Sequence, residues 1–285
     1  MSTLNSNVTR SIAQTAQYIQ EKWSREIRHP FFASLAAVPL VTDLSGLVSD
    51  GGDVINMPFT TTLNARAKAA STNITYDSPE GTPVTLPIDK HYYVGVLIED
   101  IAKIQSSYNL KTEFQKIMAE SLARQIDTDV LALYASAGTT VAGGAAIDDA
   151  DILAVVAALD AAKVPQSDRH GIVGALTKGD LLGVNKYTAY DQTGKTGKAV
   201  DGSTGLVADV YGMSIHMSQN VPTSTTGRNL FFHKSAIGVA QQQKPKFEME
   251  YSVDALGWKT ALHTVYGVGA IRPSAIVELT RTTAP

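Results

Sequence analysis

The stretch of residues 84–98 constrains the fold most, because its side chains alternate with a period of two. Every even position carries an apolar or aromatic residue, with Lys90 as the exception. Strict alternation of this kind predicts a β-strand that buries one face. At about 3.3 Å per residue, one strand over this stretch would be about 50 Å long, whereas most strands contain about five or six residues.

The preceding residues predict that this stretch forms one arm of a long hairpin. Gly51-Gly52 starts a turn, residues 53–59 are typical of a short strand, and residues 77–81 have strong turn chemistry. A compact chain of 285 residues cannot cover a whole face of so long a hairpin. We therefore expect the hairpin to lie on a second copy of the chain. The alternative is two shorter strands separated by a bulge near Asp89-Lys90.

Composition excludes several classes of protein. The chain has 24 Lys and Arg against 27 Asp and Glu, a net charge of −3, which argues against a protein that grips phosphates through a basic face. It has no cysteine, which excludes disulfide scaffolds, thiol catalysis and cysteine metal sites. The longest apolar run, residues 31–41, is too short for a membrane span of about 20 residues, and the polar first residues do not resemble a secretory signal.

Residues 1–28 predict an amphipathic helix that forms an N-terminal arm. Apolar side chains recur at three- and four-residue steps, at Ile12, Ala16, Ile19, Trp23 and Ile27. The pattern ends at His29-Pro30, because the residue before a proline avoids the helical region. This helix would dock either on the core of its own chain or partly on a neighbouring subunit.

A long helix is predicted after the alternating stretch. Apolar residues follow helical spacing over residues 109–137, with Ser106 or Ser107 as candidate caps at the start and Gly138 at the end. A helix of this length would extend over about 40 Å.

The rest of the chain alternates helix and strand signals. Residues 149–245 start with a helix that Asp149 or Asp151 could cap, and they include a polar, glycine-rich loop at residues 186–205. The closing residues 258–279 are nearly continuous extended structure, with a break at Pro273. No fixed-period repeat is present.

No catalytic, cofactor or metal site is predicted. The 6 histidines are scattered without the spacing of metal ligands. Gly194-Lys195-Thr196 belongs to a stretch that resembles a relaxed phosphate-binding loop, but the buried strand before it and the helix after it are missing. The acidic clusters Asp148/Asp149/Asp151 and Asp50/Asp53 are interpreted as a helix start and a glycine turn, with calcium binding as the alternative.

Several blocks of the sequence are similar to one known family. Residues 92–106 and 123–131 resemble stretches of the major capsid proteins of tailed phages, and residues 46–55 fit the same family. Residues 254–258, 265–268 and 271–277 resemble the family's ending. The blocks occur in the family's order and are spread over residues 46–277. The chain therefore resembles a tailed-bacteriophage major capsid (coat) protein with the Hong Kong 97-type fold.

The resemblance implies an α+β fold with an N-terminal arm, an extended β-hairpin loop, a peripheral domain with a long spine helix, and an axial domain. The expected arm is residues 1–45 and the expected extended loop is residues 46–95. The peripheral domain would take residues 96–148 and 246–285, and the axial domain residues 149–245. In this arrangement, the hairpin that the chain cannot cover becomes the extended loop lying on the adjacent subunit.

The function implied is structural rather than enzymatic and needs no cofactor. Many copies would self-assemble, as hexamers and pentamers, into an icosahedral shell around packaged double-stranded DNA, with non-specific contact to that DNA. Because the arm is too short for the scaffolding segment of some family members, scaffolding is expected from a separate protein. A portal and a decoration protein are further expected partners, and no membrane is involved. The chain would be made in the host bacterial cytoplasm and reside in the virion.

Candidate inter-subunit contacts lie in the arm and in the hairpin region, at Ile19, Trp23, Arg66, Lys68, Glu80, Lys90 and Tyr92. Two other functions stay open at this point. An encapsulin-like compartment would share the fold, and genome context beside a cargo enzyme would identify it. A nucleotide-binding enzyme would use Gly194-Lys195-Thr196, and loss of nucleotide binding in Lys195→Ala would identify that.

Overall fold

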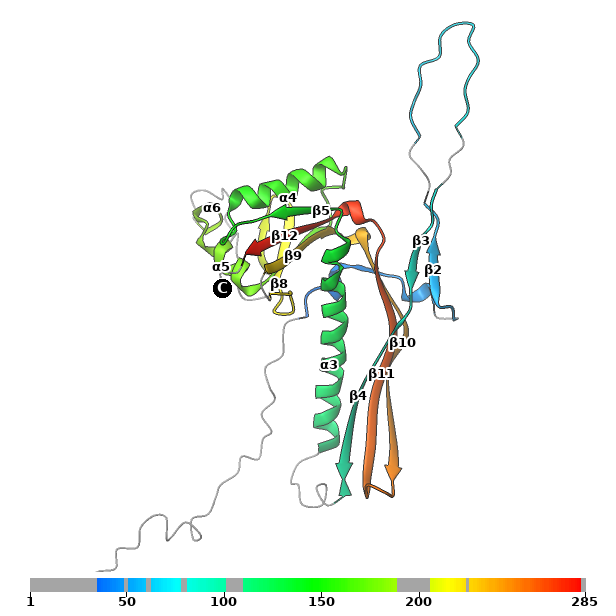
Figure 1. The fold of residues 1–285 in the computed structure, drawn as a ribbon, viewed down its shortest axis with the longest axis vertical. Coiled ribbons are helices and arrows are strands. Elements are labelled where there is room, and N and C mark those ends of the chain that lie inside the picture. Colours follow the sequence, from blue (N-terminus) through cyan, green and yellow to red (C-terminus); the bar gives the residue numbers. More distant parts are fainter. Residues whose placement is uncertain are drawn as a thin grey trace, which may run out of the picture.

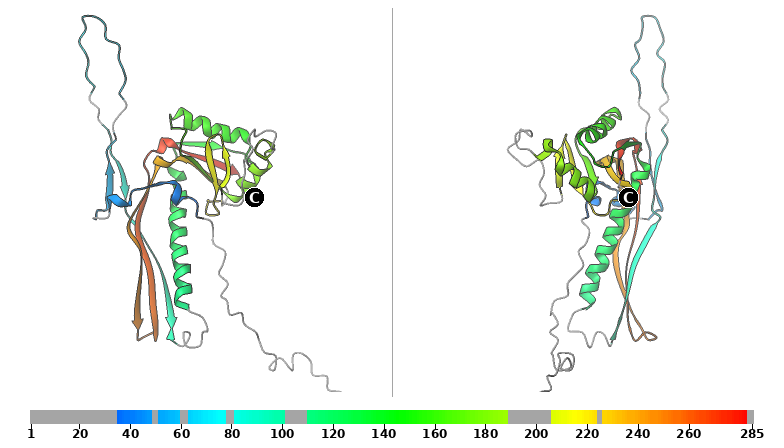
Figure 2. Two further views of the ribbon diagram at one scale, coloured as in Figure 1. Left: turned by 180° about the vertical axis from the view of Figure 1, so that it is seen from behind. Right: turned by 60° about the vertical axis from the view of Figure 1, so that its left-hand side comes forward.

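The computed structural model describes residues 35–48, 51–59, 63–77, 81–100, 110–188, 206–223 and 226–282. Figure 1 shows three parts in these residues: a unit of helices around a sheet, a long blade in which a helix runs beside strands, and a projecting hairpin. The views in Figure 2 show the hairpin pointing away from the other two parts. We call the three parts the six-stranded unit, the blade and the hairpin.

The six-stranded unit is built on a sheet of strand order β5-β12-β9-β6-β8-β7. Its strands are β5 (Thr139–Ala142), β6 (Arg169–Val173), β7 (Leu206–Val210), β8 (Met213–Met217), β9 (Thr226–His233) and β12 (Ile276–Thr282). Its helices are α4 (Asp149–Ala161), α5 (Ala175–Gly183) and α6 (Asn185–Thr188). Helix α4 packs on β5 and β12 and buries Ile152, Val155 and Leu159, whose spacing places them on one helix face.

The largest core cluster of the described residues is centred on this sheet. Phe231 and Phe232 of β9, Ile172 of β6 and Ile276 of β12 are fully buried. Successive strand residues point to opposite faces, so burial of both phenylalanines shows that both faces of β9 are covered. Gly171 permits the close approach of the Phe231 ring, because an added Cβ would lie 2.5 Å from it.

The blade contains a second sheet, of strand order β1-β10-β11-β4. Its strands are β1 (Thr42–Asp43), β4 (Lys90–Glu99), β10 (Ile237–Ser252) and β11 (Gly257–Ala270). β11 pairs antiparallel with both β10 and β4. The long helix α3 (Leu110–Leu131) covers one face of the sheet, where its Met118 and Leu122 pack with Leu262 of β11.

The predicted long helix is confirmed, but its last part is wound more tightly than expected. α3 ends at Leu131 and η4 (Ala132–Ser136), a 3-10 helix, continues the chain. Gly138 is needed for a close approach, since an added Cβ would lie 2.6 Å from the carbonyl oxygen of Pro273. The candidate caps Ser106 and Ser107 lie outside the described residues. None of the helices in the described ranges is long and apolar enough to cross a membrane.

Short 3-10 helices connect several strands of the blade and the six-stranded unit. They are η2 (Val38–Leu40), η3 (Ser45–Leu47), η5 (Lys234–Ala236) and η6 (Pro273–Ala275). η5 separates β9 from β10 and η6 separates β11 from β12, so each marks a point where the chain passes between the two sheets.

The prediction of one strand over residues 84–98 is wrong, and the alternative of two shorter strands is confirmed. The two strands are not separated by a bulge, as that alternative expected, but belong to different sheets. β3 (Val84–Pro87) pairs with β2 (Val54–Met57) in the hairpin, whereas β4 pairs with β11. Pro87 has no backbone N–H with which to hydrogen-bond to a neighbouring strand. Its carbonyl group lies so close to Gly267 that a side chain at position 267 would clash with it. The alternation continues across the break, because Leu86 of β3, Ile98 of β4 and Ile88 between the two strands are all buried.

The sheets do not follow the expected domain ranges, because strands from one expected range belong to different sheets. β4 lies in the blade, although the expected extended loop runs to residue 95. β5 and β12 lie in the six-stranded sheet, although both fall within the expected peripheral ranges 96–148 and 246–285. β10 crosses the expected boundary after residue 245, because it is a single strand of 16 residues. These differences arise from pairing between strands far apart in the sequence, which local patterns do not contain.

Candidate assembly interface

The base of the hairpin is anchored on the blade. Ile55 of β2 and Leu86 of β3 are buried with Ile88 and Ala240 in one apolar cluster. The backbone N–H of Ile88 donates to the carbonyl oxygen of Asp53 at 2.8 Å, which closes the base between the two chain segments. This cluster fixes the direction in which the hairpin leaves the blade (Figure 1).

The tip of the hairpin, residues 63–77, has no comparable support from the other described residues. Every one of these residues is exposed, and no helix or strand forms among them. The exposed fraction is 64% for Leu63, 61% for Ile74 and 87% for Tyr76. Arg66 Nη2 lies 2.7 Å from Asp77 Oδ1, but an exposed ion pair of this kind contributes at most about 1 kcal/mol. Large apolar side chains exposed on a projecting segment are typical of an interaction surface.

Two of the seven candidate contact residues lie on this tip. Arg66 and Lys68 are two positions apart, and both are exposed. Ile19 and Trp23 of the arm, and Glu80 beside the tip, lie outside the described residues.

Lys90 and Tyr92 lie instead where β4, β11 and α3 meet. Lys90 Nζ is 3.4 Å from Asp129 Oδ2, and the ring of Tyr92 stacks on Tyr266 with 5.9 Å between centroids. Tyr266 Oη donates to Asp129 Oδ2 at 2.7 Å. Burial, followed by this hydrogen bond, raises the pKa of Tyr266, so the hydroxyl stays protonated at neutral pH. These contacts brace the blade within one chain.

Asp127 has a structural role that the sequence analysis missed. Its side chain is fully buried on α3. Oδ1 accepts from the backbone N–H of Ala37 at 2.7 Å, and Oδ2 accepts from Asn220 Nδ2 at 3.0 Å. Asp129, two residues on, accepts from Tyr266 instead, because residues two apart on a helix do not face each other. Asp127 thus ties the first described residues, which follow the arm, to α3 and to the segment after β8.

The blade has a second exposed surface, on the face opposite α3. The odd positions of β4 point to it: Tyr93 is 74% exposed, and Leu97 is exposed on the same face. Between them, Gly95 lies opposite Ala261 of β11, and these two small residues form the floor of a shallow groove. The sequence analysis used only the even positions of this stretch and therefore missed the surface.

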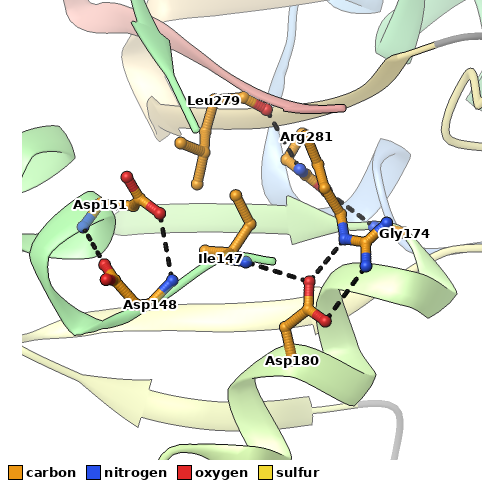
Figure 3. Close-up of polar contacts among 8 residues, drawn as sticks. Ile147, Asp148, Asp151, Gly174, Asp180, Leu279 and Arg281 are labelled. Carbon is orange, nitrogen blue, oxygen red and sulfur yellow. Dashed lines mark hydrogen bonds and ion pairs between the residues drawn. The ribbon is translucent and has the colours of Figure 1, made fainter. Parts of the chain in front are cut away.

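A polar network joins three elements of the six-stranded unit (Figure 3). Arg281 Nε of β12 donates to Asp180 Oδ2 of α5 at 2.5 Å, and the same oxygen accepts from the backbone N–H of Ile147 at 3.1 Å. Burial raises the pKa of Asp180, but the hydrogen bonds from Arg281 and Ile147 outweigh it and hold the pKa below its ordinary value. The network therefore keeps a charged carboxylate between α5, β12 and the segment before α4.

The acidic cluster at residues 148–151 forms the helix start that the sequence predicts, although the N-cap is Asp148 rather than Asp149 or Asp151. Asp148 and Asp151 each accept a hydrogen bond from the other's backbone N–H at 3.1 Å, which is a capping box (Figure 3). Within the part of the chain that the structure describes, no group of three or more His, Cys, Asp or Glu could hold a metal ion. Asp50 and Gly194-Lys195-Thr196 lie outside that part.

Solved structures of phage capsids share this fold. A structure from Mycobacterium phage Che8 is 25% identical, and the match covers 92% of this chain and 97% of that chain with a TM-score of 0.79. The capsid of cyanophage P-SCSP1u is 18% identical over 98% of this chain and 100% of that chain, with a TM-score of 0.76. The capsid of cyanophage Pam1 is 11% identical over 100% of both chains, with a TM-score of 0.71. The expected α+β fold of the Hong Kong 97 type is therefore confirmed.

The sequence itself matches a family model. Residues 83–279, more than half of the 285 residues, match the model described as phage capsid protein, and the chain belongs to this family. No curated protein matches the chain. The chain is thus a structural protein of the capsid shell.

Proposed function

We propose that this chain is the major capsid protein that self-assembles, as hexamers and pentamers, into the icosahedral shell around the packaged double-stranded DNA of a tailed phage. The hairpin is the observation that carries this proposal. Its base is buried on the blade, while its tip exposes every residue from 63 to 77. A neighbouring copy that covers the tip accounts for the exposure of Leu63, Ile74 and Tyr76 at the end of a long projection.

In this proposal, the tip of each subunit lies on the adjacent subunit. The contact is heterologous, since a patch on one copy meets a different patch on the next, and such contacts form a ring when the rotation between copies closes. Each contact is weak, but many contacts per subunit stabilise the shell. Arg66 and Lys68 are the proposed contact residues on the tip.

The other candidate contacts complete the proposed interface. Ile19 and Trp23 would dock the arm on a neighbour, and Glu80 would contribute beside the tip. Lys90 and Tyr92 already contact their own chain, so a contact between subunits would use the part of each side chain that stays accessible.

We also propose the partners and the place of action. A separate scaffolding protein, a portal and a decoration protein would join the shell, and the contact with packaged DNA would be non-specific. A net charge of −3 suits an inner surface that encloses DNA without binding it tightly. The subunit would be made in the host bacterial cytoplasm, and its role would be structural, with no enzymatic activity and no cofactor.

The test is assembly of the purified chain, expressed alone and studied by negative-stain microscopy and light scattering. Closed shells or capsomer rings are the expected result. If only a monomer of 30.3 kDa forms, the chain is expressed together with candidate scaffolding proteins. A monomer under both conditions contradicts the proposal.

A further inference from the structure

One carboxylate joins three separate segments in the six-stranded unit. Asp149 Oδ1 accepts hydrogen bonds from Tyr187 Oη at 2.5 Å and from Tyr211 Oη at 2.7 Å, and Asp149 Oδ2 lies 2.9 Å from Lys186 Nζ. Lys186 Nζ also donates to Tyr211 Oη at 2.5 Å and lies 5.1 Å from the centre of its ring. We call these four residues the Asp149 junction.

The junction connects three elements that are far apart in the sequence. Asp149 is the first residue of α4, Lys186 and Tyr187 lie in α6, and Tyr211 follows β7 directly. α6 precedes residues 189–205 and β7 follows them, so both flanks of that segment meet at the start of α4.

The charge of Asp149 strengthens the junction. Burial raises the pKa of Asp149, but hydrogen bonds from Tyr187, Lys186 and Tyr211 outweigh it and lower the pKa below its ordinary value. Burial, followed by the hydrogen bond to Asp149, raises the pKa of Tyr187. At neutral pH the carboxylate is therefore charged and the Tyr187 hydroxyl is protonated, so the hydrogen bond between them is charge-assisted.

Helix capping does not account for Asp149. Asp148 and Asp151 cap α4 by exchanging hydrogen bonds with each other's backbone, whereas Asp149 directs both oxygens to side chains of other elements. Tyr211 has a φ of 51°, in the left-handed region that aromatic residues rarely adopt. A hydrogen bond that holds its hydroxyl helps to offset the cost of this backbone conformation.

We infer that Asp149 is a positioning residue for assembly, because it fixes α6 and the β7–β8 turn on α4 and gives this part of the six-stranded unit one shape to present to neighbouring subunits. The inference rests on the proposed shell function. α4 and α5 of the same unit also expose individual apolar side chains, at Leu153, Leu176 and Leu182, that a neighbouring subunit could contact.

Hydrogen exchange of the unassembled subunit tests the positioning role directly. In Asp149→Ala, the amides of residues 185–188 and 206–211 should exchange at least about ten-fold faster than in the unchanged chain, since the charged acceptor of three contacts is lost. Asp151→Ala is the matched control, because it removes a capping contact in the same helical turn and should leave residues 206–211 protected. Unchanged protection in Asp149→Ala overturns the inference, and so does an equal loss in both variants.

Assembly of the full chain tests the consequence. Asp149→Ala should lower the yield of regular shells at least about ten-fold, because the same loss recurs at every subunit of the shell. Tyr211→Phe keeps the ring but loses the hydroxyl, and it should lower the yield by a smaller factor. Regular shells from Asp149→Ala in the yield of the unchanged chain overturn the inference and leave the proposed function intact. If the unchanged chain assembles neither alone nor together with candidate scaffolding proteins, the proposed function fails, while hydrogen exchange still decides whether Asp149 holds the two flanks.

Discussion

The six-stranded unit and the hairpin differ in what keeps each of them in place. The unit buries Phe231 and Phe232 on opposite faces of one strand and covers its sheet with helices of the same chain. The hairpin buries only its base, and residues 63–77 are exposed throughout. The difference indicates that stability and assembly reside in separate parts of the molecule. Changes in the first should alter unfolding, and changes in the second should alter shell formation.

Replacing residues 63–77 with a short Gly-Ser linker should have the largest effect and should abolish shells. The subunit should stay soluble, with nearly the same Tm, because residues 63–77 are all exposed and none of them packs on the described core. Light scattering and microscopy measure assembly, and thermal unfolding measures stability. Normal shells from this variant, or loss of the fold, would remove the distinction between the two regions.

Phe231→Ala should have the largest effect on stability and should lower the free energy of unfolding by about 3–5 kcal/mol. The ring is fully buried and packs against Gly171, so its removal leaves a cavity in the main core. Tyr76→Ala on the exposed tip is the control and should change the free energy by less than about 0.5 kcal/mol. Denaturant unfolding measures both variants. Equal losses of unfolding free energy in the two variants would contradict the idea that stability resides in the six-stranded unit and not in the hairpin tip.

Mild acid should weaken the six-stranded unit. Burial lowers the pKa of His170, with the charge of His216 acting in the same direction, and burial also lowers the pKa of His216. The two rings lie 6.3 Å apart. Because these histidines bind protons less readily in the folded state than in the unfolded chain, stability is complete above about pH 6.5 and decreases as the pH falls below it.

Thermal unfolding at about pH 5.5 and about pH 7.5 measures this effect. The unchanged chain should have the lower Tm in acid, and a variant that carries both His170→Gln and His216→Gln should lose most of the difference. The hairpin tip contains no histidine, so its contacts should not respond to the same titration. The same acid-induced drop in Tm in the double variant would show that other groups are responsible.

Arg66→Ala should have the smallest effect on stability, within about 0.5 kcal/mol, because its ion pair with Asp77 is exposed. It should nevertheless lower particle yield, by less than replacement of the whole tip. Lys116→Ala removes a comparable exposed ion pair on α3 and serves as the matched control. A fall in yield with Lys116→Ala as large as with Arg66→Ala would mean that surface charge, rather than the tip, affects assembly.

The fold was predictable where the signal was local. The long helix and α4 follow from apolar spacing within one segment, and the alternation of residues 84–98 correctly identifies the buried face. The break after Pro87 depends on Gly267, which is far away in the sequence. The turn between β7 and β8 is not evident from the sequence, because Tyr211, which adopts a positive φ there, is not a typical turn residue.

For the candidate site, too, the sequence predicted local features but not the contacts between distant elements. The exposure of Arg66 and Lys68 follows from their place between the two turn regions of the hairpin. The contacts of Lys90 and Tyr92 depend on α3 and β11, which residues 84–98 alone do not specify. Asp149 carried the signature of a helix cap, but its partner Tyr211 lies 62 residues further along the chain. Sequence patterns identified residue types and faces, and the tertiary contacts decided their partners.

A cryo-electron microscopy reconstruction of the assembled shell tests the central claim most directly, because it places residues 63–77 relative to neighbouring subunits. The account predicts that the tip of each hairpin lies on an adjacent subunit, with Leu63, Ile74 and Tyr76 covered there. A tip that folds back on its own blade, or that stays surrounded by solvent in a closed shell, would contradict it.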